Sequence, residues 1–246
     1  MSETPNILVV REEGEFSSAL RRAGFAVEAI PLIKTRPAKD LMALTEELNR
    51  LDSYDGLIFT SRAAVEVILK VGEKALRGYD GDIYVVGDSS YEILGRANVE
   101  IRGAPAESAD ELVAAILSSG VDGKRFLYFR GDRSLEKVAV GLVGSAEVNE
   151  LVVYRTVDVE LTPDQIRETS KFLSSGNSNW VCFFSPSTAE AFRRWFPISP
   201  DDLKISVVGK TTAQRSKELG FQVEFVSPKP SPKVFADGLI SAINGN

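Results

Sequence analysis

The sequence predicts an α/β fold in which two similar three-layer α/β/α domains with parallel sheets are joined by a two-stranded β connector. Short apolar runs rich in Val, Ile and Phe alternate with segments of helical periodicity, as in sheets that helices cover on both faces. The two halves of the 246-residue chain carry similar motifs in the same order. Apolar residues make up 43% of the chain, which is enough for a core in each domain.

Six short apolar runs are predicted as buried strands, because they are rich in Val, Ile and Phe. They cover residues 7–10, 56–60, 83–87, 126–129, 180–184 and 205–209. Most of them are followed by a segment with apolar residues at i, i+3 and i+4, as in a helix with one buried face. The clearest of these sets are Phe16 with Ala19 and Leu20, Ala64 with Val67 and Ile68, and Leu112 with Ala115 and Ile116.

Four segments of the first half have a counterpart in the second half. SYDGLIFTSRAAVEVI resembles NSNWVCFFSPSTAEAF, and DIYVVGDSSYEILGRANVEI resembles KISVVGKTTAQRSKELGFQVEF. ILVVREEGEFSSALRRAG resembles FLYFRGDRSLEKVAVGLVG with Arg11 matching Arg130, and IPLIKTRP resembles LVVYRTVD. Because all four matches are separated by about half of the chain, we infer a duplication. The aligned residues Asn98 and Gly220 predict a left-handed conformation at the ends of equivalent helices.

The matched segments LIKTRP and VVYRTVD differ from the other repeated segments, because no strand-turn-helix motif follows them. They are rich in β-prone residues, and they end in Pro37 or approach Pro163. We therefore predict β connectors between the domains near residues 32–37 and 152–158.

The composition excludes several classes of protein. The net charge of −6 argues against a general binder of nucleic acid or anionic membranes. The chain has no histidine, which removes Ser-His-Asp and Cys-His catalysis and nearly all zinc sites, so we expect no metal. Its start lacks the features of a signal peptide, and its single cysteine, Cys182, lies in the apolar run WVCFF. These features predict a cytoplasmic protein in which Cys182 is a buried strand residue and not a reactive thiol.

The stretch SVVGKTTAQR, residues 206–215, resembles the phosphate-binding loop of nucleotide hydrolases, because an apolar run ends in Gly-Lys-Thr. That loop also requires a glycine five residues before the glycine of Gly-Lys-Thr. In this chain the Gly-Lys-Thr glycine is Gly209, and Lys204 stands five residues before it. The repeated copy, VVGDSS, has an aspartate in place of the lysine. A nucleotide-hydrolase site is therefore a poor interpretation of this stretch.

Hydroxyl and cationic residues follow the predicted strands in both halves. Hydroxyls at helix starts can simply cap free N–H groups, and exposed cations can simply be solvated. The carboxyl ends of parallel strands are nevertheless where open α/β sheets bind ligands, and helix N-termini bind anions. Together these residues predict a pocket, in a cleft between the domains, for a ligand with several carboxylates or phosphates. The candidates are Arg11, Thr60, Ser61, Arg62, Ser89, Arg130, Ser185, Pro186, Ser187, Lys210, Thr211 and Thr212.

Several segments, in their order and spacing, resemble those of uroporphyrinogen-III synthases over nearly the whole chain. They are FTSRAAVE, VVG followed by hydroxyl residues, YRT, FSPSTAEAF, VVGKTTAQRSKELG and SPKPSPKVFADGLISAI. The resemblance implies a discontinuous first domain of about 1–34 and 159–246 and a second domain of about 37–154. It also implies a cytosolic enzyme without a cofactor, for which we expect a monomer that has at most a transient contact with the enzyme supplying its substrate.

The resemblance implies the chemistry as well. Enzymes of this family act on hydroxymethylbilane, a linear tetrapyrrole with eight carboxylates, which they cyclise to uroporphyrinogen III with loss of water and inversion of ring D. The connector tyrosine of the family matches Tyr154, which becomes the candidate acid for the leaving hydroxyl. The alternative is that Tyr154 is an aromatic residue packed against a strand. Around Arg11 and Ser89 the sequence departs from the family pattern: VVREEGEF lacks the proline that commonly follows the first arginine, and VVGDSSYEI has Tyr91 in place of an alanine.

Two other functions are compatible with the same pattern. One is a regulatory or inactive protein of the same fold, against which the retained Tyr154 argues mildly. The other is a two-lobed binding protein for a small polar ligand, but such proteins are usually exported and this chain has no export signal.

Overall fold

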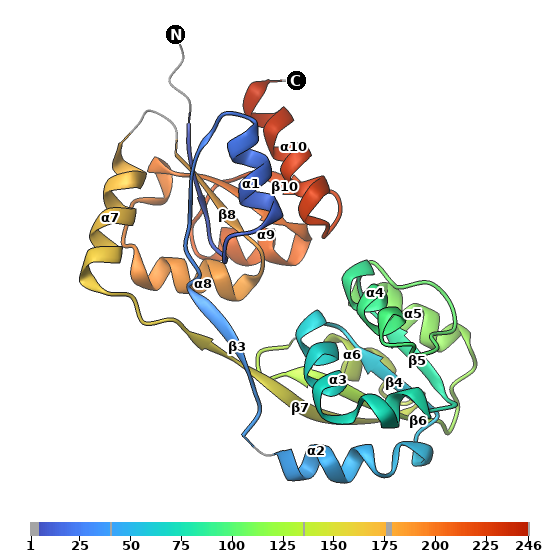
Figure 1. Ribbon diagram of the computed structural model, residues 1–246. Helices are drawn as coiled ribbons and strands as arrows, with labels where there is room; N and C mark the ends of the chain where they lie inside the picture. The colour runs from blue at the N-terminus through green and yellow to red at the C-terminus, as the bar shows by residue number, and fades with distance from the viewer. Residues whose placement is uncertain (1–4, 40, 135, 176–178, 246) are drawn as a thin grey trace. The chain divides into compact units, whose positions relative to one another are not determined.

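The computed structural model describes residues 5–39, 41–134, 136–175 and 179–245, which form two α/β units (Figure 1). The first unit comprises Met1–Lys34 and Asp158–Asn246, and the second comprises Thr35–Val157. Within the described residues, each of the two sheets has five strands. Among these residues, no helix has the length and apolar composition needed to span a bilayer.

The sheet of the first unit has the strand order β10-β9-β8-β1-β2. Each neighbouring pair in this sheet is parallel, so the carboxyl ends of its strands lie at one edge. The strands are β1 (Asn6–Val9), β2 (Ala26–Ala29), β8 (Asn179–Phe183), β9 (Lys204–Val208) and β10 (Val223–Ser227).

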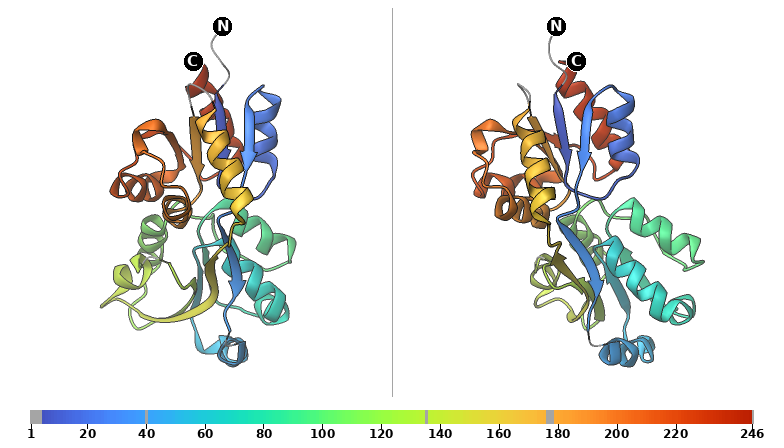
Figure 2. Two further views of the ribbon diagram at one scale, coloured as in Figure 1. Left: turned by 90° about the vertical axis from the view of Figure 1, so that its left-hand side faces the viewer. Right: turned by 60° about the vertical axis from the view of Figure 1, so that its left-hand side comes forward.

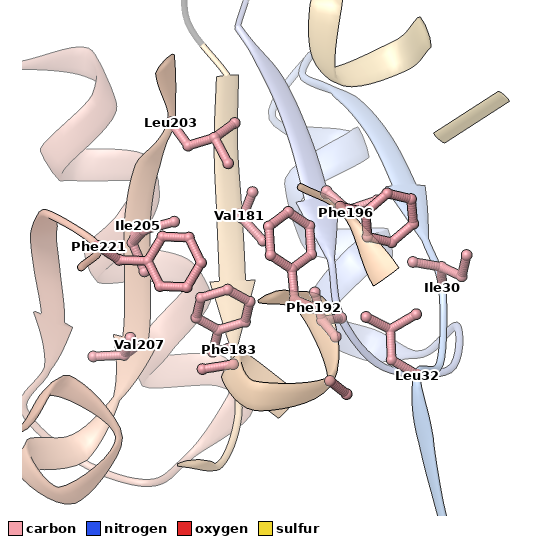
Figure 3. Packing of buried hydrophobic residues seen from close by; sticks show 14 of the residues in the cluster. Ile30, Leu32, Val181, Phe183, Phe192, Phe196, Leu203, Ile205, Val207 and Phe221 are labelled. Atoms are coloured by element: carbon pink, nitrogen blue, oxygen red, sulfur yellow. The ribbon is translucent and has the colours of Figure 1, made fainter. Parts of the chain in front are cut away.

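Helices cover both faces of this sheet, because the consecutive residues Ile7, Leu8 and Val9 of β1 point to opposite faces and are all buried (Figure 2). Ile7 and Val9 pack in one cluster with residues of α1 (Glu15–Arg22) and α10 (Pro232–Asn244). Leu8 and Val10 belong to the opposite cluster, where Phe183 and Phe192 lie with their rings 5.5 Å apart (Figure 3). That face is covered by α7 (Pro163–Ser174), α8 (Pro186–Trp195) and α9 (Gly209–Glu218), and a short 3₁₀ helix spans Pro200–Asp202.

The second sheet has the order β3-β7-β6-β4-β5. Its strands are β3 (Ile33–Pro37), β4 (Gly56–Phe59), β5 (Asp82–Val85), β6 (Arg125–Gly131) and β7 (Glu147–Asp158). One face packs against α2 (Leu41–Leu48), α3 (Arg62–Arg77) and α4 (Asp88–Arg96), and the other against α5 (Ala109–Ser118) and α6 (Lys137–Leu142). A 3₁₀ helix spans Leu51–Ser53.

The two sheets share a four-strand core that agrees with the repeat in the sequence. The order β5-β4-β6-β7 in one sheet corresponds to β9-β8-β1-β2 in the other when the matched motifs are aligned. In the first unit β10 lies beside β9, and in the second unit an isolated parallel bridge between Val86 and Ala106 lies beside β5. Asn98 and Gly220, the aligned helix-end residues, have φ angles of 55° and 87°. The left-handed conformation predicted at both positions is thus confirmed.

The residues predicted as connectors lie in β3 and at the end of β7. The Ala38 N–H donates to the Val153 carbonyl, and the Val159 N–H donates to the Leu32 carbonyl, each at 2.9 Å. Because the residue numbers run in opposite directions, the two strands are antiparallel. β7 also pairs in parallel with β6, so the connector strand is part of the second sheet.

The six predicted strands correspond to β1, β4, β5, β6, β8 and β9, although five of the predicted runs extend one or two residues past the observed strand ends. Cys182 is fully buried in β8, where the Ser206 hydroxyl donates a hydrogen bond to its sulfur at 3.1 Å. Burial raises the pKa of the Cys182 thiol to about 12. The prediction of a buried strand cysteine is confirmed, and such a thiol does not form a thiolate at neutral pH.

Candidate active site

Two of the candidate serines, one in each unit, cap the start of a helix. Ser61 accepts a hydrogen bond from the Ala64 N–H at 3.3 Å at the start of α3, and Ser185 accepts one from the Thr188 N–H at 3.3 Å at the start of α8. Thr188 Oγ1 accepts in return from the Ser185 N–H at 3.1 Å, and Pro186 is the first residue of α8. These two serines therefore have a structural role, which is the capping role that the sequence left open.

A second helix in each unit begins with a glycine in place of a capping serine. Gly87, before α4, has a φ of 83°, and Gly209, at the start of α9, has a φ of 77°. This left-handed region favours glycine. Neither helix start receives a side-chain cap from the part of the chain that the structure describes. The first N–H groups and the positive end of the helix dipole are therefore offered to an anion.

The side chains of the two glycine-led helix starts differ in charge and exposure. Lys210 and Thr211 are exposed at the start of α9, whereas Asp88 and Ser89 are exposed at the start of α4. Thr212 is only 3% exposed, so its hydroxyl is not available to a ligand in this conformation. Within the described residues, Lys210 has no ion-pair partner in the structure.

The candidate arginines have different surroundings. The exposed Arg11 places its guanidinium 4.6 Å from the centre of the Phe184 ring, at the carboxyl edge of the first sheet. Arg62 forms an exposed ion pair with Glu66 at 2.7 Å, one turn further along α3. Its charge is therefore partly balanced within its own helix.

Arg130 is held more firmly than the other candidates. It forms an ion pair with Glu150 and donates a hydrogen bond to the Ser134 carbonyl at 2.7 Å. Its Nε atom is buried and has no hydrogen-bond partner among the residues that the structure describes. The Arg130 side chain is only 14% exposed, so its charge is largely used inside the second unit.

Thr60 also has an internal partner. Its Oγ1 lies 2.7 Å from the hydroxyl of Tyr128, a β6 residue that is 1% exposed. Burial raises the pKa of the Tyr128 phenol. This hydrogen bond keeps a buried phenol satisfied, which is a structural use of Thr60.

Tyr154 lies in β7, partly buried against the core of the second unit. It lines a pocket of about 130 Å³, and its hydroxyl makes no hydrogen bond to any described residue of the structure. The other residues of this pocket come from β3 and from one face of α3. They are Thr35, Arg36, Pro37, Ala63, Glu66, Val67 and Lys70.

The sequence interpretation missed the polar members of this pocket. Ala63, Glu66 and Lys70 follow each other at helical spacing, next to the buried stripe that predicted the helix. Arg36 was treated only as part of a connector. The pocket thus joins one phenol to two cationic groups, Arg36 and Lys70, and one carboxylate, Glu66. In the described residues, no three Cys, Asp or Glu side chains are grouped closely enough to hold a metal ion.

A family model, a curated relative and solved structures all indicate the same protein family. Residues 14–236 match the family model described as uroporphyrinogen-III synthase HemD. The curated uroporphyrinogen-III synthase of Schizosaccharomyces pombe is 24% identical over 236 residues, which cover 92% of this chain and 91% of the relative.

Solved structures share the fold over nearly the whole chain. Uroporphyrinogen-III synthetase from Helicobacter pylori matches with a TM-score of 0.67 and 18% identity, over 97% of this chain and 99% of that one. A mutant uroporphyrinogen III synthase from Thermus thermophilus matches with a TM-score of 0.65 and 14% identity, over 99% of this chain and 100% of that one. The resemblance found in the sequence is confirmed, and the chain belongs to the uroporphyrinogen-III synthase family of lyases.

Proposed function

We propose that the chain cyclises hydroxymethylbilane to uroporphyrinogen III, and that Tyr154 donates a hydrogen bond to the hydroxyl that leaves ring A. One observation supports this role of Tyr154 above the others: its phenol lines a pocket and its hydroxyl has no partner among the described residues. A phenol keeps its proton at neutral pH, so it can act as a donor there.

In the reaction the C–O bond of the hydroxymethyl group breaks, and the oxygen leaves as water after gaining a proton. The remaining azafulvene cation is attacked by the substituted carbon of ring D, which gives a spirocyclic intermediate. This intermediate fragments and closes again with ring D inverted, and the loss of a proton restores the final pyrrole. No covalent bond to the enzyme is required, so orientation of the substrate and assistance to the leaving group are the main contributions of the protein.

The substrate carboxylates require positive groups, since the net charge of the chain is −6. We assign the strongest contact to the start of α9, where Lys210, Thr211 and uncapped N–H groups are combined. Arg11 at the edge of the first sheet, and Arg36 and Lys70 beside Tyr154, are further carboxylate partners. An arginine and a carboxylate 4 Å apart interact by about 4 kcal/mol at an effective dielectric of 20, so a few local pairs outweigh screened repulsion from distant charges. Arg62, Ser89 and Ser187 complete the proposed set of substrate contacts. Ser61 and Ser185 support it as the caps of α3 and α8, and Pro186 as the first residue of α8.

The activity is tested with freshly prepared hydroxymethylbilane, followed by oxidation of the product and chromatographic separation of the I and III isomers. We expect the III isomer to dominate. If only the I isomer forms, at the rate seen without protein, the chain is an inactive member of its family. Gel filtration with light scattering would test the further proposal that the active form is a monomer, and fractionated cells would test the proposed cytoplasmic location.

The role of Tyr154 is tested by the Tyr154→Phe variant, which removes only the phenol oxygen. We expect kcat to fall about 100-fold or more while KM changes little, because the lost interaction acts on the leaving group. Tyr84→Phe is the matched control, since Tyr84 is a partly buried tyrosine of the same sheet whose hydroxyl lies 3.1 Å from Ser119 Oγ. An unchanged kcat in Tyr154→Phe would leave Tyr154 with a packing role.

A further inference from the structure

We propose that the turn leaving β6, formed by Gly131 and Asp132, is the positioning element that aims the Tyr154 phenol. The inference rests on the proposed role of Tyr154 and adds two residues that do not touch the leaving group themselves. It depends on three separate features: the space above Gly131, the hydrogen bonds of Asp132, and the register of β6 against β7.

The Tyr154 ring lies directly over Gly131. A Cβ atom added at Gly131 would lie 2.4 Å from Tyr154 Cζ, 2.6 Å from the hydroxyl oxygen and 2.7 Å from Cε2. Side chains do not approach this closely, so any larger residue at position 131 would force the ring to move. The three atoms are at the end of the ring that carries the hydroxyl, so the phenol oxygen would be displaced with it.

Asp132 holds the backbone that leaves Tyr154 at two points. Its N–H donates to the Tyr154 carbonyl at 3.1 Å, and its Oδ1 accepts from the Thr156 N–H at 2.9 Å. The turn itself is closed by Ser134, whose Oγ accepts from the Gly131 N–H at 3.0 Å. The backbone of Tyr154 is thereby fixed relative to Gly131, and the ring above that glycine is fixed with it.

The register of the strands explains why Tyr154 meets a glycine at all. Arg130 pairs with Val152, whereas Gly131 pairs with Tyr154, so one extra residue of β7 is inserted at this point. Without the shift, the buried Val153 would lie opposite Gly131. Irregularities of this kind re-aim a side chain next to a functional site. The shift, the glycine and the Asp132 hydrogen bonds therefore act together on one side chain.

The test of Gly131 uses the Gly131→Ala variant. We expect kcat to fall about tenfold or more with little change in KM, because a displacement near 1 Å is costly in a positioned reaction. In the Tyr154→Phe background the same substitution should change kcat less than about twofold, since no phenol is left to misplace. The matched control is Gly56→Ala at the opposite end of this sheet, where the new Cβ would lie 2.6 Å from the Phe126 ring and away from Tyr154.

The position of the ring is followed independently of activity. The chain has six tyrosines, so Cζ-labelled tyrosine gives a small set of NMR signals, and Tyr154→Phe identifies the one from Tyr154. We expect Gly131→Ala to move this signal and Gly56→Ala to leave it unchanged. If Gly131→Ala shifts neither the signal nor kcat, the positioning role is wrong even when Tyr154→Phe is inactive. If Tyr154→Phe keeps full activity, the proposed role of Tyr154 fails, while the NMR signal still decides whether Gly131 sets the ring.

Asp132 is tested by a pair of variants. Asp132→Asn keeps an oxygen that can accept from the Thr156 N–H, whereas Asp132→Ala removes the acceptor. We expect Asp132→Ala to lower kcat a few-fold and Asp132→Asn to restore most of it. If Asp132→Asn is as slow as Asp132→Ala, the charge of Asp132 matters and its assignment as a hydrogen-bonding support is overturned.

Discussion

The helix starts of α4 and α9 occupy equivalent places in the two units and share a glycine with positive φ, but they carry opposite charges. α9 begins with Gly209 and Lys210, and α4 follows Gly87 with Asp88. The backbone of both starts suits an anion, because neither receives a side-chain cap from the described residues. Only the start of α9 adds a cationic side chain, Lys210, to these free N–H groups.

The second unit contains the proposed acid and the residues around it. It holds Tyr154, the pocket beside it, and the turn at Gly131 that supports the ring. Its glycine-led helix start is made less attractive to carboxylates by Asp88. After duplication the two halves therefore diverged in charge and in local packing, whereas the four-strand core kept its order. We infer that the first unit mainly binds carboxylates and that the second unit mainly assists the reaction.

The strongest way to break this comparison is to give α9 the charge of α4. Lys210→Asp should raise KM by about tenfold, or about 1.4 kcal/mol, and change kcat little, because it replaces an attraction to the substrate carboxylates by a repulsion. Lys217→Asp makes the same charge change in the last turn of α9 and serves as the control. Equal effects of the two substitutions on KM would show that only the total charge matters.

The second test concerns the serine-led starts. Ser185→Ala should lower the free energy of unfolding by about 1 kcal/mol, because the Thr188 N–H loses its acceptor. Ser89→Ala, which removes an exposed hydroxyl from a glycine-led start, should leave stability unchanged or slightly raise it. Urea denaturation measures both. If the two variants lose the same free energy of unfolding, the assignment of Ser185 as a cap and of Ser89 as a residue without a capping role is wrong.

The third test is the reverse of the first. Asp88→Lys should lower KM by about twofold, since a second cationic helix start would attract substrate carboxylates, while the loss of an acid from the first turn of α4 costs a few tenths of a kcal/mol in stability. Asp80→Lys places the same change in the loop before β5, at the other end of that strand, and should leave KM as it is. A KM that rises in Asp88→Lys would contradict the proposed carboxylate attraction.

The sequence alone predicted the buried strands and the repeat because these depend on local apolar runs and their order. It did not predict β2 and β10, the two edge strands of the first sheet, where Glu28 and the exposed Glu224 interrupt the apolar pattern. It also could not tell that the start of α8 is capped by Ser185 whereas the start of α9 is uncapped. Hydroxyl residues follow both strands, and they can either cap a helix or contact a ligand. The surroundings of Tyr154 depend on a register shift between β6 and β7, which is a long-range property that no local pattern contains.

The smallest effect concerns Glu13, which aligns with Asp132 when Arg11 is matched to Arg130. Asp132 accepts from the Thr156 N–H of the neighbouring strand, whereas Glu13 accepts hydrogen bonds from Arg21 and from the Ser17 hydroxyl, both in the helix α1 that follows it. These contacts, with Arg21 the largest, lower the pKa of Glu13 from 4.5 to about 2. A carboxylate whose pKa is lower in the folded state stabilises the fold above its unfolded pKa. This contribution is lost as the pH falls from about 4.5 toward 2.

Glu13→Gln should therefore lower the free energy of unfolding at pH 7 by only about 0.5 kcal/mol, because the Glu13–Arg21 pair is largely exposed to solvent. The difference from the unmodified chain should shrink between pH 4.5 and pH 2.5, because Glu13 becomes protonated there in the unfolded chain, whereas its pKa of about 2 keeps it mostly charged in the folded state. Urea denaturation at several pH values measures this trend, and Glu12→Gln is the neighbouring control. A difference that stays constant down to pH 2.5 would mean that Glu13 acts through its shape and not through its charge. The divergence between Glu13 and Asp132 would then concern packing after β1 and β6 and not electrostatics.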